Sequence, residues 1–356
     1  MKTQARLTLA AIAALAIATP GRAQEGAYPW RMEEVAAGVF AALQPADARF
    51  DDSNSTVILG ANEVVVVDTQ ADPAAVKALI AWIGSVTDVP VRLVINTHWH
   101  GDHTQGNAIY RDVYGEDLEI IGHASLVQDV PGRAAAFVSE RTAYFDAELP
   151  AAHERLQAGV FRDGSVMSDA DREEQRAVLA RAEAWLSANR GARFVAPNRT
   201  YGSRQRLRRA GRTIDLVHFT GHTRGDTVVW LPQDGVALTG DLLDDLPYAG
   251  HGYPTSWRDA LAALRELPIE VTVPGHGAVF RDGRKLDAAY GFLDALITQT
   301  AAAVAAGQDL ESTVATISLE SWRDRLASDE VAAQFFDQTL GEAIERAWLE
   351  ARGEIE

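Results

Sequence analysis

The feature that most constrains this chain is a short run of metal-binding side chains. His98, His100, Asp102 and His103 lie within six positions, directly after the apolar segment 91–96. That segment is short and rich in β-branched residues, so it predicts a buried strand, with the polar run in the loop that follows it. Imidazole is the commonest transition-metal ligand, and zinc accepts imidazole nitrogen together with carboxylate oxygen. A chance cluster of surface histidines is the alternative, but three of the nine histidines fall inside these six positions, which favours a metal site.

The first residues have the pattern of a cleaved secretory signal. Lys2 and Arg6 precede an apolar stretch at 7–19, and small residues follow before position 24. This pattern predicts that residues 1–23 are removed and that the mature protein is soluble and periplasmic or secreted. A retained N-terminal anchor is the alternative. No later segment reads as long and apolar enough to cross a bilayer, so we expect no stable membrane insertion.

Composition limits both the ligands and the partners of the predicted site. The chain has no cysteine, so metal ligands must be histidines and carboxylates, and no disulfide is available. Its 33 Lys and Arg against 50 Asp and Glu give a formal charge of −17, which disfavours nucleic acid as a partner. The most basic stretch, 204–212, leads into a strand-like run and is interpreted as a solvated hairpin. We expect a small-molecule substrate. The sequence patterns do not indicate the oligomeric state.

The order of the predicted elements indicates an α/β fold. Two halves of similar pattern, in which strands alternate with helices, predict sheets with helices on their outer faces, within a main domain at 24–285. Between the halves, residues 125–190 read as a helical insertion that is either a lid over the site or a packed appendage. From 286 to 356 the chain reads as a helical extension packed on the core. The expected strands lie at 56–60, 63–68, 91–96, 118–121, 213–219, 227–231, 236–239 and 270–273, and the expected helices of the two halves at 73–84 and 257–267.

Three further polar motifs each follow a predicted strand. They contain His222, Asp241 and His276. A lone histidine after a strand is more often structural than a ligand, but sheets of this class place their chemistry at strand ends. Together with the first run, these residues make a set of five histidines and two aspartates, which is enough to bind two metal ions.

The complete set of motifs resembles the metallo-β-lactamase-fold hydrolase superfamily. The matching segments are HxHxDH at 98–103, GHTxGD at 221–226, TGD at 239–241 and PGHG at 274–277, in the order of that superfamily. The resemblance implies an αββα sandwich with a dinuclear site at one edge, with two zinc ions as the expected cofactors. It also implies the role of each residue: His98, His100 and His222 for the first metal, Asp102, His103 and His276 for the second, Asp241 as the bridge, Asp102 and Asp241 as catalytic residues, and Asp68 and Asp226 as supports of the ligands.

Two cations that share a water would generate a hydroxide nucleophile near neutral pH and would stabilise the oxyanion that develops on the substrate. No Gly-x-Ser-x-Gly motif is present for a serine nucleophile. Asp241 is the discriminating residue, since the β-lactamases of the superfamily commonly carry Cys or Ser there, whereas glyoxalase II-like thioesterases and lactonases carry Asp. We therefore expect hydrolysis of an ester, lactone, thioester or related acyl substrate.

Three alternatives stay open: a β-lactamase, a mononuclear-iron persulfide-type dioxygenase, and a non-catalytic metal-binding protein. The ligand set suits zinc, iron and manganese alike. Candidate substrate contacts are His218, in a predicted strand, and His251 and Tyr253, in the segment after Asp241.

Overall fold

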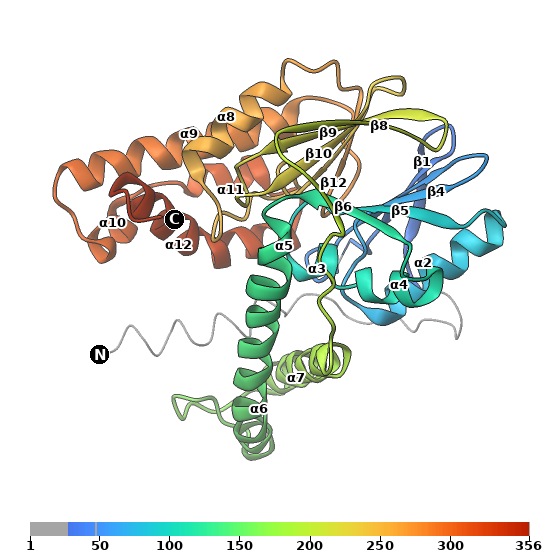
Figure 1. Ribbon diagram of the computed structural model, residues 1–356. Coiled ribbons are helices and arrows are strands. Elements are labelled where there is room, and N and C mark those ends of the chain that lie inside the picture. Colours follow the sequence, from blue (N-terminus) through green and yellow to red (C-terminus); the bar gives the residue numbers. More distant parts are fainter. Residues whose placement is uncertain (1–27, 47, 356) are drawn as a thin grey trace.

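The computed structural model describes residues 28–46 and 48–355, so the predicted signal at 1–23 lies outside the described residues. Within this part of the chain, two sheets of seven and five strands form the centre of the protein (Figure 1). The first sheet has the order β1-β2-β3-β4-β5-β6-β7, antiparallel up to β4 and parallel beyond it. Its strands are β1 (Arg31–Ala36), β2 (Val39–Leu43), β3 (Ser55–Leu59), β4 (Val64–Val67), β5 (Val91–Ile95), β6 (Glu119–His123) and β7 (Arg199–Tyr201).

The second sheet has the order β12-β11-β10-β9-β8. It is antiparallel from β8 to β11, and its edge strand β12 is parallel to β11. Its strands are β8 (Arg204–Arg209), β9 (Arg212–Phe219), β10 (Asp226–Leu231), β11 (Val236–Gly240) and β12 (Val271–Pro274). The basic stretch at 204–212 is the β8–β9 hairpin, as interpreted from the sequence.

The two sheets pack face to face because their strands alternate inward and outward apolar residues. In β4, Val65 and Val67 join the core between the sheets, whereas Val64 and Val66 face the helices outside. Those helices are α2 (Pro73–Val86) and α4 (Asn107–Tyr114), and the short helix α3 (Gly101–Thr104) lies between them in the chain. Tyr110 of α4 is fully buried against this outer face.

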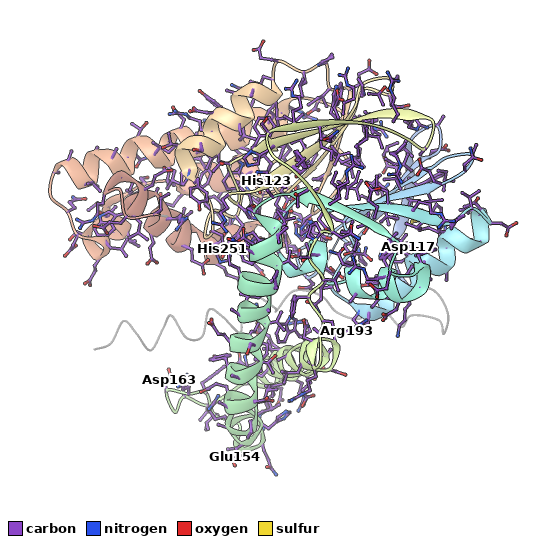
Figure 2. The ribbon with its side chains drawn as sticks, in the orientation of Figure 1. Asp117, His123, Glu154, Asp163, Arg193 and His251 are labelled. Atoms are coloured by element: carbon purple, nitrogen blue, oxygen red, sulfur yellow. The ribbon has the colours of Figure 1, made fainter. Side chains whose placement is uncertain are left out.

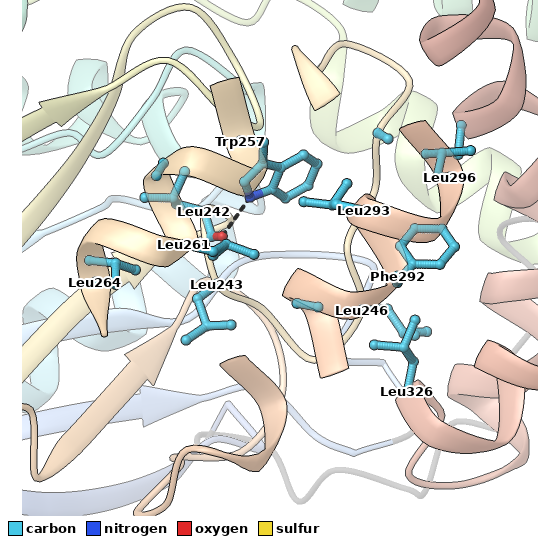
Figure 3. Packing of buried hydrophobic residues seen from close by; sticks show 14 of the residues in the cluster. Leu242, Leu243, Leu246, Trp257, Leu261, Leu264, Phe292, Leu293, Leu296 and Leu326 are labelled. Atoms are coloured by element: carbon cyan, nitrogen blue, oxygen red, sulfur yellow. Dashed lines mark hydrogen bonds between the residues drawn. The ribbon is translucent and has the colours of Figure 1, made fainter. Parts of the chain in front are cut away.

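The outer face of the second sheet is covered by C-terminal helices. These are α8 (Pro254–Leu264), α9 (Arg284–Ala305), α10 (Leu310–Thr316), α11 (Glu320–Leu326) and α12 (Glu330–Ala351). Trp257 of α8 and Leu293 of α9 lie at the centre of the cluster, and the indole N–H of Trp257 donates a 2.7 Å hydrogen bond to the carbonyl of Leu242 (Figure 3). The four layers confirm the predicted αββα sandwich.

One sequence expectation about the C-terminal region is wrong. Among the described helices, α9 is long and apolar enough to cross a membrane by length and composition. Its residues Phe292, Leu293 and Leu296 are nevertheless buried in the core beside the second sheet, and core helices of this kind pass the same test. The absence of membrane insertion stays a prediction.

The segment expected to be a helical insertion forms an arm. It contains α5 (Leu126–Asp129), the π-helical turn η1 (Val130–Ala134), α6 (Ala135–Ala158) and α7 (Asp169–Asn189). Figure 1 shows α6 and α7 extending away from the sandwich, where they pack on each other through Phe145, Ala182 and Leu186. The arm therefore has its own small apolar contact, while its root at α5 packs on Trp99 and pairs Asp129 with Arg224, in the turn before β10.

Candidate metal centre

The loop after β5 carries four of the predicted ligands and is shaped by Asp68, which directly follows β4. Asp68 has a left-handed backbone (φ 59°), and its carboxylate accepts hydrogen bonds from the Thr97 amide at 2.8 Å and the Thr97 hydroxyl at 2.7 Å. The Nδ1–H of His103 donates to the same carboxylate at 2.8 Å. The parallel pairing of β4 with β5 brings these residues together at one edge of the sheet.

The other ligand candidates come from loops of the second sheet. His222 follows β9, in a turn held by Asp226, whose carboxylate accepts from the amide and hydroxyl of Thr223. Asp241 and His276 follow the parallel strands β11 and β12, whose ends meet at the same edge. All seven residues expected to be ligands therefore lie at one edge of the sandwich.

These side chains form two groups. Within each group, the candidate ligand atoms all lie within 4.8 Å of one another. One group is His98, His100, His222 and Asp241, and the other is Asp102, His103 and His276. Oδ2 of Asp241 is 3.6 Å from Nε2 of His98 and 3.6 Å from Nε2 of His276, so this carboxylate lies between the groups. The grouping has the arrangement that the resemblance implied, and ligation itself stays a prediction.

Four of the histidines are oriented by hydrogen bonds on the side away from the centre. In each case Nδ1 has an oxygen partner that accepts its proton, which leaves the lone pair of Nε2 directed to the group. The partners are the Thr97 hydroxyl for His98 at 3.1 Å, Asp68 for His103, the Tyr248 carbonyl for His222 at 2.9 Å and the Arg49 carbonyl for His276 at 2.7 Å. Such outer partners fix the tautomer and the ring orientation of metal-binding histidines.

Several polar atoms at the centre have no hydrogen-bond partner among the described residues. They are Nε2 of His98, Nε2 of His103 and Oδ1 of Asp241, all three buried, and the 3.2 Å approach of the last two lacks hydrogen-bond geometry. Buried polar atoms are rarely left unpaired in folded proteins. Atoms of this kind, converging from imidazole and carboxylate donors, fit divalent cations.

Electrostatics also indicates that the centre attracts positive charge. Burial opposes ionisation of Asp241, but neighbouring His103 and His276 outweigh it and hold the pKa of this carboxyl well below its usual range. Burial likewise opposes the charged form of His103, yet Asp241 and Asp102 raise its pKa well above the ordinary value. His98 differs, since burial and the nearby His103 lower its pKa. The acids of the centre therefore favour positive charge at this position.

Asp244 is a buried acid that the sequence reasoning missed. It forms a third group with Asp241 and His276, and its carboxylate accepts the His276 amide at 2.7 Å. Burial raises its pKa well above the usual range. The signal was available, because Asp244 follows Asp241 by three positions in the same loop, but such spacing is common in loops without a ligand.

A second buried network supports His276 from outside. Arg49 donates to Asp245 at 2.7 Å and to Asp329 at 2.6 Å, and Lys285 donates to Asp245 at 2.7 Å. Because the Arg49 carbonyl accepts from His276, this network connects the centre to α9 and to the start of α12.

The three candidate substrate contacts occupy different places. His251 lies against the centre, with its Nδ1 2.9 Å from Nε2 of His100. His218 stacks on His123 with ring centroids 3.8 Å apart and belongs to neither metal group. Tyr253 precedes α8, with the Arg346 guanidinium 5.1 Å from its ring. Contact with a substrate stays a prediction for all three.

Comparison with known proteins agrees with the fold and with the superfamily that the motifs resemble. Residues 48–125 and 149–276 match the family described as the Metallo-beta-lactamase superfamily, and the chain belongs to this hydrolase superfamily, whose members bind divalent metals. It is 22% identical over 225 residues to a linear primary-alkylsulfatase of Pseudomonas sp. (strain ATCC 19151), covering 60% of this chain and 39% of that protein.

Solved structures show the same fold. The stereoselective inverting sec-alkylsulfatase from Pseudomonas sp. aligns with a TM-score of 0.61 and 16% identity, over 90% of this chain and 50% of the other. A metallo-beta-lactamase family protein from Thermus thermophilus aligns with a TM-score of 0.51 and 17% identity, over 85% and 89% of the two chains. This chain therefore spans about half or less of the length of the two alkylsulfatases.

Proposed function

We propose that this protein is a dinuclear metal-dependent hydrolase that acts on an ester, lactone, thioester or related acyl bond. The observation that carries the proposal is the position of Asp241, whose carboxylate lies between the two ligand groups. Its Oδ2 is 3.4 Å from Nε2 of His222, and its Oδ1 is 3.2 Å from Nε2 of His103. One carboxylate can therefore serve both groups.

The donor set favours zinc at both positions. In this proposal the first group holds one cation, the second group holds the other, and Asp241 is shared between them. Imidazole nitrogen and carboxylate oxygen without thiolate suit zinc, although iron and manganese accept the same ligands. When bound, such a cation pair supplies a hydroxide nucleophile near neutral pH and stabilises negative charge that develops on the substrate.

The residues of the chain keep this centre rigid and shielded. Asp68, Thr97 and the carbonyls of Arg49 and Tyr248 hold the imidazole rings, so little reorganisation is needed when a substrate binds. Asp102 is the most exposed of the predicted ligands in the second group, with 25% of its side chain exposed. A substrate would therefore approach from the side of Asp102.

Hydrolysis of an alkyl sulfate ester is a second candidate. The name of the Pseudomonas relative favours it, and so does Arg141 of the arm. Its guanidinium lies 5.3 Å from the centroid of the Trp185 ring, and Asp51 is the acid whose charge acts on it. Its charge also acts on Tyr248, whose ring lies 6.1 Å from that of His222, and a cation on this side of the arm would favour an anionic substrate.

The test combines metal analysis with a substrate panel. The metal bound to the purified chain is quantified before and after loading with zinc. The chain is then assayed against carboxylic esters, lactones, thioesters, β-lactams and alkyl sulfates, with Asp241→Ala as the site variant and exposed Asp117→Ala as the matched control. We expect two zinc ions per chain and acyl-bond hydrolysis that is lost only in Asp241→Ala. Turnover of alkyl sulfates alone would select the second candidate.

Other outcomes would overturn the proposal. Turnover of β-lactams alone would identify a β-lactamase. One iron per chain without hydrolysis would favour oxygen chemistry, and two bound metals without turnover of any substrate would favour a non-catalytic metal-binding protein.

A further inference from the structure

His100 differs from the other four histidines of the centre in the nitrogen that it presents. Its Nδ1 lies 3.1 Å from Nε2 of His222, inside the first group, whereas its Nε2 points outward. The outward nitrogen meets Nδ1 of His251 at 2.9 Å. For the other four histidines the outward partner is an oxygen, so His100 alone in the set depends on another imidazole.

This contact has only one arrangement of protons that is compatible with metal binding. If Nδ1 of His100 presents its lone pair to a cation, its proton must be on Nε2. That proton is then donated to Nδ1 of His251, which must be unprotonated, so His251 carries its own proton on Nε2. His251 thereby selects the tautomer of His100 that can bind at Nδ1.

The surroundings of His251 hold its ring in place. The Trp99 ring lies 5.3 Å away on one side, and the Tyr248 ring lies 5.7 Å away at an interplanar angle of 86°. Figure 2 places His251 beside the root of the helical arm, next to the sandwich.

We propose that His251 is a positioning residue that holds His100 in the tautomer binding through Nδ1 and thereby sets the affinity of the first group, His98, His100, His222 and Asp241, for a divalent cation. The inference rests on the proposed dinuclear site. In this inference His251 acts by orienting the predicted metal ligand His100, and not by contacting the substrate. The second group, Asp102, His103 and His276, has no contact with His251 among the described interactions, so its affinity is independent of this residue.

Zinc affinity, measured without substrate, tests this role. Metal-free wild type, His251→Phe and His251→Gln are titrated with zinc against a chromophoric chelator, and exposed His153→Phe of the arm is the matched control. We expect His251→Phe to weaken one of two sites by about 10- to 100-fold and to leave the other unchanged. His251→Gln, whose side-chain oxygen can accept the His100 proton, should restore the affinity to within about threefold.

The outcomes separate this inference from the proposed function. Unchanged zinc binding in His251→Phe, equal weakening of both sites, or failure of glutamine to restore the affinity would overturn the positioning role. If the wild type binds only one zinc ion, and His251→Phe weakens that binding, the role of His251 is supported and the dinuclear proposal is contradicted. Circular dichroism of each metal-free variant checks that the fold is intact.

Discussion

Oδ2 of Asp68 lies 2.8 Å from Nδ1 of His103, on the opposite side of the imidazole ring from the metal groups. Both side chains are buried, with 4% of Asp68 and 0% of His103 exposed. The carboxylate therefore acts on the predicted second site through the histidine. Outer partners of this kind orient a ligand and increase its basicity.

The first prediction concerns this contact. Asp68→Ala removes the acceptor for His103 and for the Thr97 amide, so we expect the second site to bind zinc about 10- to 100-fold more weakly. Chelator-competition titration measures the two affinities. Asp117→Ala, on the surface, is the control, and a larger loss at the first site than at the second would contradict the assignment.

The second prediction concerns close packing around Asp241. A Cβ atom at Gly275 would overlap Oδ1 of Asp241 and lie 3.0 Å from Cε1 of His103. Gly275→Ala should therefore displace the shared carboxylate and weaken both zinc sites. Bound zinc per chain after dialysis measures the effect. The control is Gly84→Ala in α2, where a Cβ meets no atom within 4 Å, and wild-type zinc content in Gly275→Ala would refute the expectation.

The third prediction concerns the buried charges beneath His276. Asp245→Ala leaves Arg49 and Lys285 without their shared carboxylate, and loss of one partner from a buried ion pair costs about 3–5 kcal/mol. We expect the free energy of unfolding to fall by about that amount in urea titrations. Asp112→Ala, which breaks the exposed pair with Arg193, should cost no more than about 1 kcal/mol. Equal costs in the two variants would contradict the prediction.

The fourth prediction concerns pH. Burial, followed by the neighbouring His218, lowers the pKa of His123 from 6.5 to about 4, and His123 Nδ1 accepts from the Ser125 amide. Between these values the unfolded chain binds more protons than the folded chain, so stability is lost as the pH falls from about 6.5 to about 4. After allowance for solvent screening, the contribution is about 1–2 kcal/mol.

Unfolding in urea at a series of pH values checks this expectation. His123→Gln should show a shallower loss of stability across that window than wild type. His153→Gln on the arm controls for the removal of a histidine, and an equal change of slope in both variants would argue against His123 as the source.

Local patterns were sufficient for the strands that carry ligands. The valine-rich segments of β4 and β5 were expected as strands because they are short, β-branched and bounded by turn residues. The β1–β2 hairpin at Arg31–Leu43 was missed, because Met, Glu and Ala residues weaken its β pattern, and its pairing with β3 stabilises it. The helical character of residues 125–190 was visible in the sequence. Their extension as an arm was not, because it depends on which helix faces pack on each other and which pack on the sandwich.

The supporting contacts could not be predicted because their partners are distant in the sequence. Arg49 and His276 are 227 positions apart, and His100 and His251 are 151 positions apart. No local pattern encodes such hydrogen bonds. His251 was selected for its residue type and its loop, but its contact with His100 needed the folded chain.

The sequence by itself determined the class of this protein, because the order and spacing of five histidines and two aspartates at strand ends are specific to one fold and one kind of site. Only the tertiary structure decided which nitrogen of each imidazole faces the centre, which acids stay outside it and what holds each ring. The physical reason is that ligand identity is a property of single residues, whereas tautomer, burial and charge depend on neighbours that meet only when the two sheets pack together.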